Sequence, residues 1–439
     1  MRRFVDCHTH LLLGGRTLTQ LDLSKVSSRG EFEAAIAAEH ARLPKSAWLE
    51  AHGWNEGRWG GERPTRDWLL GAGDRPVVAY RMDQHACVVN DAVRSLLRDA
   101  IAPAGGEIVL DDRGERTGLM LEQAAWQLVN PLVPAPSVES KRDSLRAACA
   151  HAASLGLEAV CSMEYLADAI EVFDPLRAEL PIRIAITLLD RGDDFDPSKA
   201  FLVRHDDRLW VNGFKSFADG TLGSRTARML ENYSDDPGNR GMLVERALDG
   251  TLSEWARAVI DAGLSPSVHA IGDEALRVTL DAIEPVDPQR TTRFEHAQTI
   301  HPDDVPRLRG RLVSMQPLHR AFDREPARTR LGAHRMNRFF PFRALLDHGA
   351  ILGFGSDWPI VDLDPRKGLE QATRPRGASA GGAAAPAADP APEWCSLTND
   401  EALAAYGTNA PRFLGAPSSM RAASNAGAAP SARAERSSS

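Results

Sequence analysis

The stretch Phe4-Val-Asp-Cys-His-Thr-His10 is the part of this sequence from which the fold and the site are best inferred. A short apolar run leads into two histidines that stand two positions apart. Alternate residues of a β-strand share one face, so both imidazoles reach a common point. Neutral imidazole is a common ligand of zinc and related metals. Because the chain has 13 histidines, such a pair also arises by chance, and it predicts a metal site only together with its context.

Composition limits the class of protein. With 439 residues, 43% of them hydrophobic, the chain can build the core of one large catalytic domain. The net charge of −8 and the scattered basic residues favour a small-molecule substrate over nucleic acid. Five cysteines without a Cys-x-x-Cys pair argue against a disulfide framework and a cysteine zinc site. No long apolar run occurs, so we expect a soluble cytoplasmic protein away from membranes, with homo-oligomerisation left open.

Helix and strand patterns alternate from residue 137 to residue 359. The first helix of this series covers residues 140–155, and Gly156 marks its end. Together with the opening stretch, eight strands are predicted, at residues 4–8, 158–163, 182–188, 210–217, 264–270, 293–297, 311–316 and 350–356. Eight parallel strands joined by right-handed crossovers predict a closed (β/α)₈ TIM barrel, an α/β fold.

Three stretches fall outside the barrel pattern. Residues 45–130 are expected to form a small inserted α+β region after the first strand, with the tryptophans between Trp48 and Trp68 as its core. Residues 375–392 are rich in alanine, glycine and proline, which predicts a flexible loop before the last helix. The catalytic domain is expected to cover residues 1–414, and the small, polar residues 416–439 predict a disordered tail.

Chemically useful side chains gather at the ends of the predicted strands, which is where barrel active sites are assembled. Candidate metal ligands from five strands are His8, His10, Lys215, His269, His296 and Asp357. A site for one zinc ion needs only three protein ligands, so this surplus suggests two metal ions. We therefore expect one or two divalent ions as the cofactor, with zinc as the metal. A bridge between two ions could come from Lys215, because a deprotonated lysine takes up carbon dioxide to give a carbamate, which offers carboxylate oxygens.

The whole pattern resembles the amidohydrolase superfamily and, within it, the amidohydrolase family 3 group that includes N-substituted formamide deformylase. The resemblance runs from residue 4 to about residue 414 and rests on the stretches at residues 6–10, 53–59, 83–90, 215–226, 268–273, 295–298 and 355–359. It implies a metal-dependent hydrolase that cleaves a carbon–nitrogen bond other than a peptide bond, with the six candidate ligands as the metal shell. Asp357 is the candidate catalytic residue, which takes a proton from water and passes it to the leaving nitrogen.

Weaker candidates have structural alternatives. His85 and His319 either line the substrate pocket or are satisfied structural histidines. Arg225 either binds a polar substrate or pairs with a nearby carboxylate. Asp219 is assigned to a turn rather than to acid catalysis. Strand alternation turns Glu295 away from the side of His296, which predicts a supporting or structural group.

Two rival interpretations remain open at this point. In the first, the protein is a deaminase-like amidohydrolase with a single metal ion, and Lys215 is structural. In the second, it is a truncated, catalytically silent binding protein. The resemblance implies a flanking β-sandwich made by segments on both sides of the barrel, and we expect this chain to lack those segments. We therefore expect some apolar surface of the barrel to be exposed or covered by a partner.

Overall fold

The computed structural model describes residues 3–82, 84, 86–103, 106–189, 195–373 and 396–415. The chain divides into two compact units, the first made of Met1–Leu11 with Cys149–Ser439 and the second of Leu12–Ala148. The second unit encloses residues 45–130, where an insertion was expected, and extends beyond them at both ends. The expected loop at 375–392 and the expected tail at 416–439 lie outside the described residues.

The first unit is built on eight strands, and each strand pairs in parallel with the next one in this unit. All eight predicted strands are present, with ends that differ by one or two residues. They are β1 (Phe4–Thr9), β8 (Leu157–Glu164), β9 (Arg183–Leu189), β10 (Leu209–Phe217), β11 (Ser265–Ala270), β12 (Arg293–His296), β13 (Leu312–Met315) and β14 (Ile351–Phe354). The prediction of an α/β fold of the TIM-barrel type is confirmed.

Hydrogen bonds from the segment after β14 to β1 bring the last and first strands together. The backbone N–H of Asp357 donates to the carbonyl of His8 at 2.7 Å, and the N–H of His10 donates to the carbonyl of Trp358 at 2.9 Å. Gly355 makes this approach possible, because a Cβ there would stand 2.5 Å from the backbone nitrogen of His8. The two ends of the sheet therefore meet at the histidine pair.

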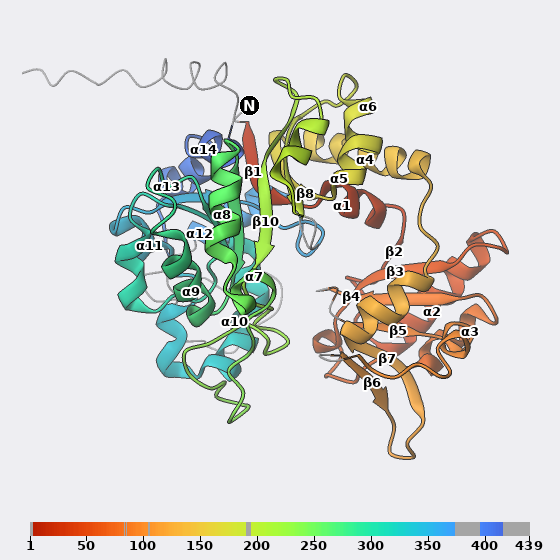
Figure 1. Cartoon of the computed structure of the whole chain (residues 1–439). Coiled ribbons are helices and arrows are strands. Elements are labelled where there is room, and N and C mark those ends of the chain that lie inside the picture. Colours follow the sequence, from red (N-terminus) through yellow and green to blue (C-terminus); the bar gives the residue numbers. More distant parts are fainter. Residues whose placement is uncertain are drawn as a thin grey trace, which may run out of the picture. The chain divides into compact units, whose positions relative to one another are not determined.

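Helices lie around these strands (Figure 1). Their apolar residues recur at helical spacing, as in α8, where Leu252, Trp255, Ala256 and Val259 are buried. The helices of this unit are α5 (Leu166–Asp168), α6 (Asp174–Leu176), α7 (Glu245–Asp249), α8 (Leu252–Asp261), α9 (Asp273–Ile283), α10 (Pro317–Leu331), α11 (Phe342–Asp347), α12 (Pro365–Thr373), α13 (Asn399–Ala405) and α14 (Ala410–Leu414). Across the described ranges, no helix has both the length and the apolar character that a bilayer crossing requires.

Helix α14 fills the barrel at the N-terminal ends of its strands. Its Phe413 belongs to a buried cluster with Val5 of β1 and Trp210 of β10. The indole N–H of Trp210 donates to the carbonyl of Leu414 at 2.8 Å. Gly353 of β14 lies so close that a Cβ there would stand 2.6 Å from the Phe413 ring. One phenylalanine thus closes the end of the barrel opposite the histidine pair.

Replacing Phe413 with alanine is expected to lower the free energy of unfolding by about 3–5 kcal/mol, because it leaves a cavity that rigid strands cannot refill. Urea unfolding followed by circular dichroism measures the change. Phe322→Ala is the matched control, since the Phe322 side chain is exposed and should contribute little. Equal effects of the two substitutions would show that Phe413 does not support the barrel.

The second unit is an α+β structure around a six-stranded mixed sheet in the order β2-β3-β4-β5-β7-β6. Trp54 and Trp68 are buried in its core, and Trp59 packs against it, so the predicted core role of the tryptophans is confirmed. Its elements are α1 (Leu11–Thr17), β2 (Leu21–Asp22), α2 (Arg29–Arg42), β3 (Leu49–Trp54), β4 (Val77–Arg81), β5 (Ala86–Val89), α3 (Asp91–Leu96), β6 (Gly106–Leu110) and β7 (Arg116–Glu122), and α4 (Val138–Ser154) leads back to the first unit.

Candidate metal centre

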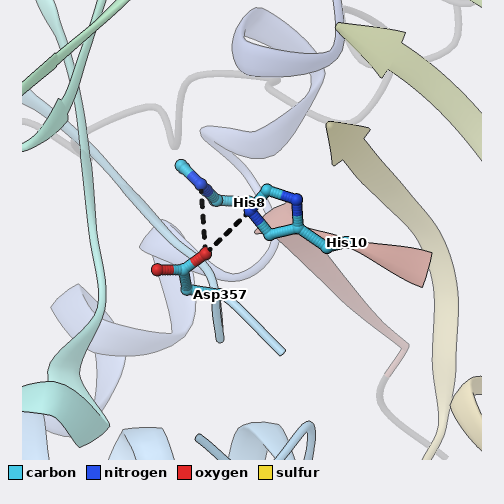
Figure 2. A group of neighbouring side chains, drawn as sticks. All are labelled: His8, His10 and Asp357. Atoms are coloured by element: carbon cyan, nitrogen blue, oxygen red, sulfur yellow. Dashed lines mark ion pairs between the residues drawn. The ribbon is translucent and has the colours of Figure 1, made fainter. Parts of the chain in front are cut away.

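Three predicted ligands meet at the C-terminal ends of β1 and β14. The Nε2 atoms of His8 and His10 lie 3.4 Å and 3.1 Å from the same carboxylate oxygen, Oδ1 of Asp357. Figure 2 shows both imidazoles directed at that carboxylate. One donor atom from each residue fits within 4.8 Å of the other two, which is the spacing of a shared metal ion. The strand period helps to explain the pair, because His8 lies on β1 and His10, two residues later, directly follows the strand's last residue, Thr9.

Lys215 reaches the same place from β10. Its side chain is buried, and Nζ lies 3.1 Å from Nε2 of His8. Nζ also lies 4.9 Å from the centre of the Phe217 ring, which covers it on one side. The predicted bridging lysine is therefore adjacent to a predicted metal ligand.

His269 and His296 extend the cluster from β11 and β12. The ring of His296 lies 4.8 Å from the ring of His8 and 4.6 Å from the ring of His269, measured between centroids. Both side chains are buried. Four strands thus contribute imidazole or amine groups to one cluster of polar side chains at the barrel's C-terminal end, where such folds carry their active sites.

In His8, His296 and His269, a hydrogen bond at one ring nitrogen leaves the other ring nitrogen with a free electron pair. Nδ1 of His8 lies 2.6 Å from Oε2 of Glu295, and Nδ1 of His296 lies 2.8 Å from Oε1 of Gln316. In His269 it is Nε2 that lies 3.0 Å from the carbonyl of Gly220. An acceptor at one nitrogen fixes the proton there, so the other nitrogen can bind a metal. The donor set therefore fits a divalent ion that prefers nitrogen and oxygen.

Burial disfavours the charged form of three histidines in the cluster. Desolvation, together with the nearby Lys215, lowers the pKa of His269 to about 3. Burial also lowers the pKa of His10, and it lowers that of His296 strongly, helped by His269. Asp357 behaves oppositely, because the adjacent His8 and His10 outweigh desolvation and hold its pKa well below the ordinary value. Neutral imidazoles around a carboxylate anion are the protonation states that metal binding requires.

The metal-free protein is expected to lose stability as the pH falls from 7 to 5. Unfolded histidine titrates near pH 6.5, whereas folded His269 stays neutral to about pH 3, so below pH 6.5 only the unfolded chain gains this proton. At pH 5 this single site costs about 2 kcal/mol. Urea midpoints of chelator-treated protein at both pH values measure the loss. His269→Gln should reduce the difference, and an unchanged difference would contradict the assignment.

The three weaker candidates for substrate binding differ in where the structure places them. His319 reaches the site, with Nε2 at 3.8 Å from Oδ2 of Asp357 and its ring stacked at 6.4 Å on that of His296. Arg225 forms a two-point ion pair with Asp235, at 3.1 Å and 2.7 Å, which is the second of its two alternatives. His85 lies outside the described residues.

Glu295 and His296 are neighbours in sequence, and both reach the site. The prediction that they face opposite sides was wrong, because His296 (φ 68°) and Ala297 (φ 42°) leave the extended conformation. Glu295 contacts His8, with Oε2 at 2.6 Å from Nδ1, and its supporting role stays a prediction. No sequence pattern predicts a positive φ at a histidine, so strand alternation alone could not predict the directions of the Glu295 and His296 side chains.

Two buried aspartates connect the loops that carry the ligands. Asp6 accepts hydrogen bonds from the backbone N–H groups of His8 and Ser356, at 2.9 Å and 3.0 Å. Asp219 accepts from the N–H groups of Ile271 and Gly272, at 3.0 Å and 2.8 Å. Asp219 is thus more than the turn residue that was predicted, because it fixes the loop after β11 to the loop after β10.

Comparison with known proteins agrees with this geometry. A family model described as the amidohydrolase family matches residues 4–420. The protein LONG AFTER FAR-RED 3 of Arabidopsis thaliana is 32% identical over 403 residues, which cover 84% of this chain and 67% of that protein. YtcJ of Bacillus subtilis (strain 168) is 33% identical over 396 residues, which cover 84% of this chain and 72% of that protein.

The fold has a counterpart among solved structures. An uncharacterized metal-dependent hydrolase from Pyrococcus horikoshii OT3 superimposes with a TM-score of 0.72 at 27% sequence identity. The match covers 94% of this chain and 81% of that one. With the histidine and aspartate cluster at the strand ends and a family match across the barrel, the chain belongs to the amidohydrolase family, in its family 3 group, and is a metal-dependent hydrolase.

Proposed function

We propose that this protein hydrolyses a carbon–nitrogen bond of the amide or formamide type in a small molecule, with a divalent ion, zinc, as its cofactor. The observation that carries the proposal is the meeting of His8, His10 and Asp357 within 4.8 Å at the C-terminal end of the barrel. Membership of the amidohydrolase family supports the reaction class. His269, His296 and Lys215 would complete the metal shell.

The protein's own groups divide the work. His8 and His10 would hold the ion, which lowers the pKa of a coordinated water and polarises a carbonyl oxygen. Asp357 is a buried carboxylate kept ionised by its histidine neighbours, so it can accept the proton of the attacking water and return it to the leaving nitrogen. His319, 3.8 Å from Asp357, is positioned to contact the substrate beside this carboxylate.

A second ion would need a bridging ligand, and Lys215 is our candidate. Its neutral amine would add to carbon dioxide, forming a nitrogen–carbon bond and releasing one proton, to give a carbamate with two oxygen donors. The 3.1 Å separation of Nζ from Nε2 of His8 supports the proposal that both side chains bind the same ion. The Lys215 side chain is buried beside His8.

One observation favours the alternative interpretation, a deaminase-like amidohydrolase with a single metal ion. The three donors that come within 4.8 Å of one another, His8, His10 and Asp357, already satisfy a zinc ion that keeps one open position. In that case Lys215 would remain an amine and the chemistry would resemble that of a deaminase. Metal stoichiometry distinguishes the two forms.

The proposal is tested by metal analysis of the purified full chain, coupled to a screen of N-formyl and N-acyl amines. We expect bound zinc and release of an amine from at least one class of substrate. Metal-free protein that stays inert after zinc is added would overturn the proposal. The silent-protein alternative fails if any N-acyl substrate is hydrolysed and Asp357→Ala abolishes that activity.

A further inference from the structure

A column of charged and polar side chains runs up the inside of the barrel toward His8. Arg293 and Glu295 lie two residues apart on β12, so both face the barrel interior, and neither is exposed to solvent. Nε of Arg293 forms an ion pair of 2.8 Å with Oε1 of Glu295. A buried charge pair of this kind is costly unless its remaining polar atoms are satisfied, so its partners indicate what it does.

Arg293 is fixed by groups from three other segments. Its Nη2 donates to the carbonyl of Cys7 on β1 at 2.6 Å. Its Nη1 donates to the sulfur of Cys161 on β8 at 2.8 Å and to the carbonyl of Phe413 on α14 at 3.1 Å. The guanidinium is therefore held in one orientation by β1, β8 and the helix that plugs the barrel.

Glu295 connects the fixed Arg293 to His8 of the candidate metal centre. Its Oε1 accepts from the hydroxyl of Ser267 at 2.7 Å and faces Arg293, whereas its Oε2 lies 2.6 Å from Nδ1 of His8. The ion pair with Arg293 and the hydrogen bond from Ser267 hold this side chain as a carboxylate, which can only accept. Nδ1 of His8 must then be the donor, which leaves Nε2 as the nitrogen that faces Lys215 and Asp357.

We propose that Glu295 is a positioning residue that, held by Arg293 and Ser267, fixes His8 as its Nδ1–H tautomer and so presents Nε2 to the metal. The inference rests on the proposed metal centre, but it concerns the metal-free protein and can fail or hold independently of any hydrolytic activity. It also gives α14 a role in the site, because the carbonyl of Phe413 is one of the groups that orient Arg293.

Glu295→Gln gives the sharpest test, because its outcome is set by the Ser267 hydroxyl, which donates to Oε1, and by the positive charge of Arg293 beside the same atom. The amide oxygen would face Arg293 and accept the hydrogen bond from Ser267, which turns the NH₂ group toward His8. An amide N–H beside Nδ1 can only donate, so His8 should change to the Nε2–H tautomer. That form cannot bind a metal through Nε2, and metal affinity should fall about 10–100-fold.

The experiment uses the full chain labelled with ¹⁵N-histidine and stripped of metal by a chelator. Two-bond ¹H–¹⁵N correlations distinguish the tautomers, and loss of one signal in His8→Gln assigns the residue. We expect Nδ1–H in the unaltered chain and in Ser267→Ala, which keeps the carboxylate, and Nε2–H in Glu295→Gln. Zinc affinity, measured against a competing chelator, should fall in Glu295→Gln and stay unchanged in Ser267→Ala.

Two outcomes would overturn the proposal. The first is His8 as Nε2–H in the unaltered metal-free chain, a measurement that needs no variant to fold. The second is a Glu295→Gln protein whose melting temperature falls while the His8 tautomer and the zinc affinity stay the same, which would make Glu295 a structural residue only. Failure to find an amide substrate, by contrast, would count against the proposed function and leave the tautomer result standing.

Discussion

Asp357→Asn is expected to lower kcat/KM by about 10²–10⁴-fold for any amine-releasing substrate. Asparagine keeps the shape of the side chain, but it has no negative charge and cannot take up a proton at neutral pH. Its amide also weakens the contact with the Nε2 atoms of His8 and His10, which now share Oδ1 at 3.4 Å and 3.1 Å. Steady-state kinetics at saturating zinc separate the loss of proton transfer from the loss of metal.

Asp362→Asn is the matched control for this prediction. Asp362 lies five residues further along the chain from Asp357, and its carboxylate forms an ion pair with Lys367 near the surface. The same loss of one negative charge there should leave kcat/KM unchanged. If Asp357→Asn and Asp362→Asn were equally active, proton transfer by Asp357 would be excluded.

The barrel could be predicted because its signals are local. Strands such as β9 are short apolar runs, and the helices between the strands have their own apolar spacing, as in α8. The positions of His8, His269 and Asp357 follow from that reading, since parallel strands bring their C-terminal ends to one side. Once the strands have been predicted from the sequence, the site residues at their C-terminal ends can therefore be predicted as well.

The supporting groups could not be predicted, because they depend on contacts between distant segments. Arg293 meets the carbonyl of Phe413 across 120 residues and that of Cys7 across 286. Gln316 finds His296 only because β12 and β13 are neighbours. The extent of the second unit likewise depends on the pairing of strands such as β5 and β7, which no turn signal specifies.

Lys215→Ala is expected to reduce bound zinc from two ions to one per chain, if Lys215 carries the bridging carbamate. The reason is geometric as well as chemical, since Nζ lies 3.1 Å from Nε2 of His8. Inductively coupled plasma mass spectrometry on chelator-treated, zinc-reloaded protein gives the stoichiometry. Reloading with and without bicarbonate should change the zinc content of the unaltered chain only.

Lys367→Ala is the matched control, because Lys367 is a surface lysine paired with Asp362 and its loss should leave the zinc content unchanged. One zinc per chain in both the unaltered protein and Lys215→Ala would reject the bridge and favour the site with one metal ion. Acetate makes the test more specific. A carbamate is a carboxylate by function, so a small carboxylate that enters the space left in Lys215→Ala should restore the second ion, whereas it would change nothing if Lys215 were an amine that only packs against Phe217.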